Sequence, residues 1–150
     1  DYAVIIDYAH TPDGLVKVLD AARATKPKRL VTVFGCGGDR DRDKRPIMGN
    51  SADEKSDRFI ITDDNPRTED PALIVKDIIE GISSSKEKYD VIHGRGKAIQ
   101  HAINTAEPGD MIIIAGKGHE ATQVLKDETI EFNDVEVADE FVTKRLEREK

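Results

Sequence analysis

Short runs rich in valine and isoleucine alternate along this chain with longer stretches in which apolar residues recur at helical spacing. Runs of this kind separated by helical stretches are typical of βαβ units, which place their strands in one mostly parallel sheet. The pattern therefore predicts an α/β fold with strands at about 3–6, 30–34, 59–61, 89–92 and 111–115.

The stretches between the strands carry signals of helices that should cover both faces of the sheet. In the first, the apolar residues at positions 15, 18, 19 and 22 form one face, Thr11 is placed to cap the helix, and Pro12 suits its first position. We expect helices at about 11–24, 46–55, 71–82, 96–106 and 135–148.

A β-hairpin is expected after Glu120, where the alternating segments 123–125 and 129–132 flank a short polar connection. We expect it to add an antiparallel strand at one edge, which gives a mostly parallel sheet of about six strands.

The composition excludes several classes of protein. A net charge of −7 argues against nucleic acid as the main partner, and no apolar run approaches the length of a membrane span. The lone Cys36 cannot form an internal disulfide, which fits a reducing compartment such as the cytoplasm. Because the chain opens without methionine and enters an apolar run by residue 3, we expect residues 1–150 to be one domain of a longer protein.

Glycine and charged residues gather in the loops that follow the predicted strands. In an open parallel sheet, ligands bind beyond the carboxyl ends of the strands. The loops at the opposite rim, 25–29 and 83–88, are plain polar connections. This asymmetry predicts a binding site built from the loops 7–13, 35–46, 62–70, 93–97 and 116–120.

The loop after the second predicted strand contains glycines at 35, 37 and 38 but completes neither standard phosphate-binding motif. These glycines allow a tight turn and a close approach to a ligand, which we favour over a strained turn alone. Arg40, Lys44 and Arg45 are candidates for anion binding. We interpret the alternating charges at 41–43 as a solvated loop.

The next loop, 62–70, contains side chains that could bind both charged groups of an amino acid ligand. Pro66 fixes a turn, and Arg67 offers a planar fork to a carboxylate. Asp64 and Asn65 offer acceptors to an ammonium group, and Glu120 could complete that site. An Asx-Pro turn with a surface arginine explains this loop equally well.

Two features of the same rim stay open. Lys117 could be a surface lysine or a phosphate contact. The histidines at 93, 101 and 119 are spaced too irregularly to predict a zinc site, and we expect no metal site in this domain.

Taken together, four segments resemble the C-terminal domain of Mur ligases: DYAHTP at 7–12, GCGGDR at 35–40 with KRP at 44–46, DNPR at 64–67, and GKGHE at 116–120. The resemblance covers the whole chain and implies a Rossmann-like fold. Its best match is to the members that add meso-diaminopimelate to UDP-MurNAc-L-Ala-D-Glu in peptidoglycan synthesis.

The resemblance implies an ATP-dependent amide ligase in which a carboxylate is phosphorylated and the amine of diaminopimelate attacks the acyl phosphate. ATP and Mg²⁺ would be bound mainly by a central domain, and the UDP group by an N-terminal domain, neither of which is in this sequence. The isolated domain should be inactive, and the whole enzyme should be a cytoplasmic monomer.

The family's binding residues transfer to this chain by motif. Arg40, Asn65 and Arg67 would bind the distal carboxylate of diaminopimelate, and its distal ammonium would be surrounded by Asp64, Gly116 and Glu120. Lysine-adding relatives lack the arginine that matches position 67.

The nucleotide contacts transfer less completely. Asp7 would bind the ATP ribose, and His10 would lie nearby. Ala9 stands where glutamate-adding relatives carry a lysine, so that contact does not transfer.

Two alternatives remain. Asp7, Asp63 or Asp64, and Lys117 are placed like the acidic pocket and lysine of a phosphoacceptor receiver domain. A related ligase with another amino acid substrate, as in folylpolyglutamate synthase, would also share the fold.

Overall fold

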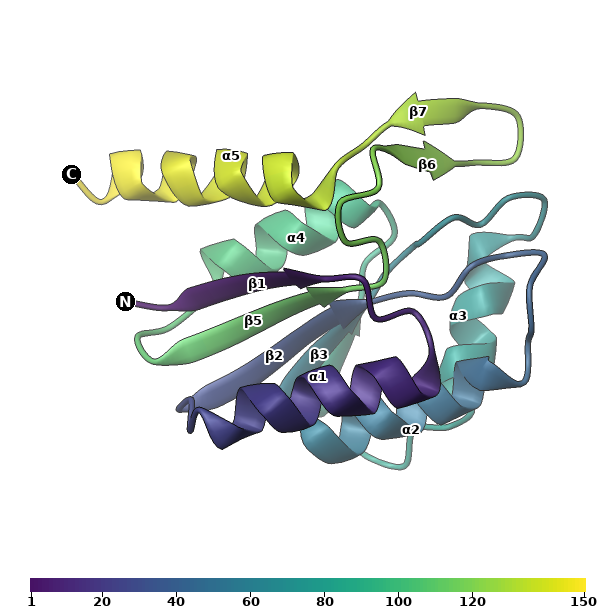
Figure 1. Ribbon diagram of the computed structural model, residues 1–150, viewed down its shortest axis with the longest axis horizontal. Helices are drawn as coiled ribbons and strands as arrows, with labels where there is room; N and C mark the ends of the chain where they lie inside the picture. The colour runs from purple at the N-terminus through teal and green to yellow at the C-terminus, as the bar shows by residue number, and fades with distance from the viewer.

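The computed structural model describes all 150 residues. The strands are β1 (Ala3–Asp7), β2 (Arg29–Phe34), β3 (Arg58–Ile61), β4 (Tyr89–Val91) and β5 (Asp110–Ala115). They form one sheet in the order β1-β5-β2-β3-β4, in which all neighbours are parallel (Figure 1). Each predicted strand is present, and its ends lie within one residue of the expected ones.

Helices cover both faces of this sheet, so the predicted α/β class is confirmed. The helices are α1 (Pro12–Ala24), α2 (Lys44–Lys55), α3 (Pro71–Ile79), α4 (Arg95–Asn104) and α5 (Asp134–Arg148), with a short 3-10 helix η1 (Lys86–Lys88) before β4. One face carries α1, α2 and α3, and the other carries α4 and α5 (Figure 1). None of these helices has the length and apolar character needed to cross a membrane.

The two apolar layers follow from the alternation of side chains along each strand. Phe34 and Phe59 are fully buried on the side of α1 to α3, where they pack with Leu15 and Leu19 of α1. The alternate residues of the strands, such as Val33, face α4 and α5 instead. Both faces of the central strands β2, β3 and β5 are therefore buried, which explains their continuous apolar runs.

The helix starts reflect the local capping signals. Thr11 Oγ1 accepts a hydrogen bond from Gly14 N, and Pro12 follows it as the first residue of α1, as predicted. Asp70 caps α3 in the same way, with Pro71 next. The helix α2 begins at Lys44, earlier than predicted, and therefore takes in part of the charged loop.

The predicted hairpin is present as β6 (Thr122–Val124) and β7 (Thr129–Glu131), but it forms a separate antiparallel sheet. The expectation of about six strands with an antiparallel strand at the edge is corrected in this detail, because the main sheet has five strands. The reason lies in β6, whose Val124 carbonyl accepts from Arg67 N while Val124 N donates to Asn65 Oδ1. The hairpin therefore pairs with the loop after β3 and not with a sheet edge.

Candidate functional site

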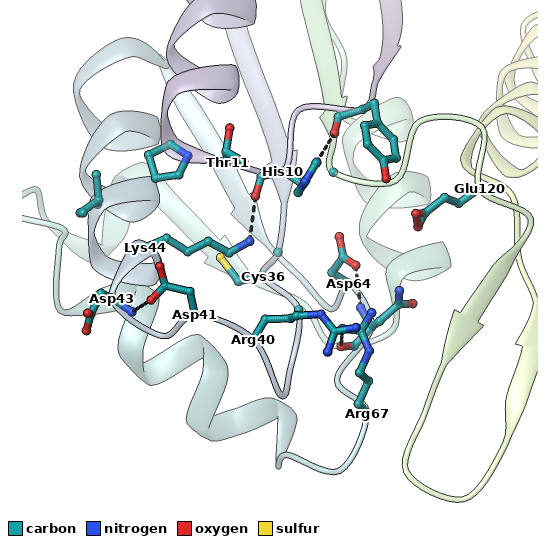
Figure 2. Close-up of a pocket in the computed structure, with 17 residues that line it drawn as sticks. His10, Thr11, Cys36, Arg40, Asp41, Asp43, Lys44, Asp64, Arg67 and Glu120 are labelled. Carbon is teal, nitrogen blue, oxygen red and sulfur yellow. Dashed lines mark hydrogen bonds between the residues drawn. The ribbon is translucent and has the colours of Figure 1, made fainter.

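A cavity of about 600 Å³ opens at the carboxyl ends of the parallel strands. Its walls come from the loops after β1, β2, β3 and β5, which the sheet brings to one rim (Figure 2). Seven of the eight sequence-predicted binding residues line it: His10, Arg40, Asp64, Asn65, Arg67, Gly116 and Glu120. The remaining one, Asp7, does not line this cavity.

The floor of the cavity depends on two glycines that let neighbouring loops touch. A Cβ at Gly35 would lie 2.2 Å from the carbonyl oxygen of Thr62, and one at Gly38 would lie 1.9 Å from that of Pro66. Gly38 N also donates to Asn65 O at 2.7 Å. The glycine loop after β2 is therefore built against the loop after β3, so Gly35 and Gly38 allow a close approach between two loops, and the predicted close approach to a ligand stays a prediction.

Two arginines reach the cavity from these two loops. The Arg67 side chain donates from Nη1 to Gly38 O at 3.0 Å, and its backbone adopts a left-handed φ of 52°. Arg40 donates from Nη1 to Asp39 O at 2.8 Å and is exposed at the cavity mouth. Both arginines flank Gly37 and lie together in Figure 2. Both keep guanidinium nitrogens free of protein partners, so this side of the cavity is suited to an anion.

Asn65 adds an uncharged donor to the same side. It is buried, and its Oδ1 accepts from Lys117 Nζ and from Val124 N, both at 2.9 Å. No protein group accepts from Asn65 Nδ2, which leaves its two N–H groups for a ligand.

Carboxylates supply the opposite polarity. The Asp64 side chain is buried, and its Oδ1 accepts from Asn65 N at 2.7 Å. Its Oδ2 lies beside Gly116, where an added Cβ would come within 2.8 Å of it at a φ of 122°. Glu120 lines the same cavity and is only partly buried. The cavity therefore presents both guanidinium groups and carboxylates, which together complement the two charges of an amino acid zwitterion.

The loop after β1 contributes a third wall. Asp7 Oδ2 accepts from Ala9 N at 2.8 Å, which shapes the turn, and leaves Oδ1 without a protein partner. His10 is exposed, and its Nδ1 lies 3.1 Å from Tyr8 O. Lys44 Nζ donates to His10 O at 2.9 Å, so the start of α2 is tied to this loop across the cavity (Figure 2).

Arg45, expected as an anion-binding candidate, is instead a structural residue. Its side chain is fully buried and donates to Glu69 at 2.6 Å, to Asp77 at 3.0 Å and to Gly37 O at 3.1 Å. The hydrogen bonds that Arg45 donates to Glu69 lower the pKa of the Glu69 carboxyl to about 2. Since its charge is already neutralised by two carboxylates, Arg45 holds the glycine loop in place and is not free for a ligand.

Two buried groups at this rim lay beyond the sequence analysis. Arg95 Nε and Nη2 bind both oxygens of Asp134 at 2.7 Å, and Nη2 also donates to Ala115 O at 3.1 Å. Gln123 Nε2 donates to Asp64 O at 2.6 Å. The partners of Arg95 are 39 and 20 residues away in the chain, so no local pattern identifies them.

Two residues of the receiver-domain alternative, Asp63 and Lys117, make other contacts in the structure. Asp63 binds His93 Nδ1 at 2.9 Å and Gly94 N at 3.0 Å, and it therefore serves the start of α4. Lys117 binds Asn65 and not a phosphoacceptor carboxylate. No three His, Cys, Asp or Glu side chains lie together in a group that could hold a metal ion.

Comparisons with known proteins agree with this geometry. A family model described as Mur ligase, glutamate ligase domain, matches residues 1–118. The chain is 55% identical over 94% of its length to UDP-N-acetylmuramoyl-L-alanyl-D-glutamate--2,6-diaminopimelate ligase of Clostridium botulinum, and 52% identical over 97% to that of Synechocystis sp.. It spans only 29% and 28% of the length of these curated relatives.

Solved structures of similar fold include a protein with the same name as these relatives. A structure of UDP-N-acetylmuramoyl-L-alanyl-D-glutamate--2,6-diaminopimelate ligase superposes with a TM-score of 0.92 at 41% identity, over 97% of this chain and 30% of that one. The Escherichia coli FolC structure in complex with ADP superposes at 0.57 with 16% identity, over 98% of this chain and 30% of that one, which shows a shared fold only. With a family model that covers more than half of its residues, the chain belongs to the Mur ligase family.

Proposed function

We propose that this chain is the amino-acid-binding domain of an ATP-dependent ligase that adds meso-diaminopimelate to UDP-MurNAc-L-Ala-D-Glu in peptidoglycan synthesis. The names of the similar proteins support this substrate pair. In this proposal the UDP-binding and ATP-hydrolysing domains belong to the rest of the longer protein. The buried Cys36, with no disulfide partner, supports a cytoplasmic location.

One observation carries the proposal: a single cavity is lined by the arginines Arg40 and Arg67, by Asn65 with its free amide donor, and by the carboxylates of Asp64 and Glu120. Diaminopimelate has a carboxylate and an ammonium at each end. Arg40, Asn65 and Arg67 would bind the distal carboxylate. Asp64 and Glu120 would bind the distal ammonium, with Gly116 leaving room for it.

This chain's contribution to the reaction is then orientation. Positively and negatively charged side chains would hold the distal carboxylate and the distal ammonium of diaminopimelate. The substrate would therefore bind in one direction, with its other amine pointing away from these side chains. ATP supplies the phosphoryl group that activates the glutamate carboxylate. Asp7, whose Oδ1 has no protein partner, and the neighbouring His10 are the residues we assign to the nucleotide.

Substrate selection follows from the same residues. L-lysine has no distal carboxylate, so it would leave Arg67 and Asn65 Nδ2 without their partner in a closed site. An unpaired donor of this kind costs about 1–3 kcal/mol, which corresponds to roughly 5- to 150-fold in affinity.

The experiment is calorimetry on the full-length enzyme, with a non-hydrolysable ATP analogue and the UDP-linked substrate bound so that no turnover occurs, titrated with meso-diaminopimelate or with L-lysine. We expect binding of meso-diaminopimelate and at least tenfold weaker binding of lysine. Equal affinities would refute the assignment of the cavity. The isolated chain should show no ligase activity. ATP hydrolysis by the isolated chain at ligase-like rates would refute the proposal that another domain of the longer protein hydrolyses ATP.

A further inference from the structure

Lys117 lies two residues after the end of β5 and is fully buried, although it carries a positively charged side chain. A buried ammonium group is costly unless it is paired and hydrogen-bonded. Its Nζ donates to Asn65 Oδ1 at 2.9 Å and lies 3.4 Å from Glu120 Oε1. Lys117 therefore connects the loop after β5 to the loop after β3 underneath the cavity.

These contacts determine which way the Asn65 amide faces. An asparagine amide has an acceptor oxygen on one side and a donor nitrogen on the other. Lys117 Nζ and Val124 N are both donors, and both lie 2.9 Å from the same atom, so that atom is the oxygen. Asn65 Nδ2 is consequently the end of the amide that is left for a ligand.

The direction of this amide matters because Asn65 lines the cavity beside Arg67. With Nδ2 facing the ligand, Asn65 and Arg67 both donate toward a carboxylate. With the amide reversed, its oxygen would face that carboxylate and repel it. Val124 donates from its backbone N–H, which only a substitution to proline would remove. Lys117 is therefore the donor to Asn65 Oδ1 that can be removed by changing a side chain alone.

We propose that Lys117 is a positioning residue that orients the Asn65 amide toward the anionic group of the amino acid substrate. This inference rests on the proposed function of the cavity. It assigns to Lys117 an effect on amino acid binding alone, transmitted chiefly through Asn65 at 2.9 Å and to a smaller extent through Glu120 at 3.4 Å. A direct contact with a phosphate would instead change the steps that involve ATP.

The test is steady-state kinetics of the full-length enzyme carrying Lys117→Met, which keeps the length of the side chain and removes the donor. We expect KM for meso-diaminopimelate to rise by about tenfold or more, with KM for ATP and kcat within about twofold of wild type. Lys76→Met, at an exposed lysine of α3, is the matched control and should leave all three constants unchanged.

A double-mutant cycle separates positioning from general destabilisation. In an Asn65→Ala background, Lys117→Met should cause a much smaller further rise in KM for meso-diaminopimelate, because the amide that it orients is gone and only its longer 3.4 Å contact with Glu120 is left to lose. A further rise as large as in the wild-type background would overturn the proposal, and so would a Lys117→Met enzyme whose main change is in kcat or in KM for ATP.

A second variant and the activity of the wild-type enzyme separate a failure to fold, a failure of the proposed function and a failure of the role of Lys117. If Lys117→Met does not fold, Lys117→Leu, which also lacks a hydrogen-bond donor, goes through the same cycle, with the same outcomes expected. A wild-type enzyme that does not use meso-diaminopimelate would refute the proposed function itself. A wild-type enzyme that uses it, with an unchanged KM in the Lys117 variant, would refute only the role of Lys117.

Discussion

Arg67 Nη1 donates to the carbonyl oxygen of Gly38 at 3.0 Å, so the side chain assigned to the substrate carboxylate is held by the neighbouring glycine loop. Gly38 N donates in return to Asn65 O at 2.7 Å. The two loops therefore form one unit, and a change in either should alter amino acid binding.

The contact between these loops makes Gly38 intolerant of a side chain. Gly38→Ala would place a Cβ 1.9 Å from Pro66 O, so one of the loops must move. We expect a loss of about 1–3 kcal/mol in the free energy of unfolding, measured with urea, together with a raised KM for diaminopimelate in the full-length enzyme. Gly96→Ala is the control, because its Cβ would meet only Phe132 at 3.7 Å and it lies within α4. That variant should be as stable as wild type or more stable, by up to about 1 kcal/mol.

Arg67→Lys tests the guanidinium fork separately from its charge. Lysine keeps the charge and faces the same left-handed φ of 52°, but it cannot donate to Gly38 O and to a carboxylate with a planar fork. We expect KM for meso-diaminopimelate to rise by about 5- to 150-fold, with a smaller effect on KM for ATP. Arg148→Lys, on the exposed end of α5, should have no effect. An unaltered KM in Arg67→Lys would show that the assignment of Arg67 is wrong.

The sequence allowed prediction of those features that depend on local pattern. Apolar periodicity located the strands, and the cap at Thr11 with Pro12 located the start of α1. The rim could be predicted because the carboxyl ends of parallel strands meet at one edge, which brought Arg40 and Arg67 from separate loops into one cavity.

Features that depend on tertiary partners could not be predicted. Arg45 has the same local sequence signal as Arg40, yet Glu69 and Asp77 neutralise it inside the protein. The burial of Lys117 depends on Asn65, which is 52 residues away. The hairpin was recognised from its alternation, but its placement depends on hydrogen bonds to the loop after β3, which no local pattern specifies.

The buried pair Arg95 and Asp134 should be a major determinant of stability. Both side chains are fully buried, and removal of one leaves the other charge uncompensated. We expect Asp134→Ala to lower the free energy of unfolding by about 3–5 kcal/mol in urea titrations. The double variant Arg95→Met with Asp134→Leu should recover much of that loss. A loss below about 1 kcal/mol in Asp134→Ala would contradict this account.

Cys36 should be unreactive in the folded protein, although it lines the cavity. Burial raises the pKa of its thiol to about 12, so almost no thiolate is present at pH 8. We expect a thiol-reactive chromogenic disulfide to label the folded chain at pH 8 far more slowly than the chain in denaturant. Equal labelling rates in the two states would show that the thiol is accessible.

Glu69 should make stability depend on acid pH. Hydrogen bonds from Arg45 lower its pKa from 4.5 to about 2, so its ionised form is favoured in the folded state. This stabilisation, at most about 3 kcal/mol, is complete above pH 4.5 and is lost as the pH falls through about 2. In urea titrations, wild type should exceed Glu69→Gln in unfolding free energy at pH 7, and the difference should shrink toward pH 2. Glu128→Gln, at an exposed glutamate of the hairpin turn, should show no such difference. If the gap between wild type and Glu69→Gln stayed constant from pH 7 to pH 2, the pairing of Glu69 with Arg45 could not be the source of its stabilisation.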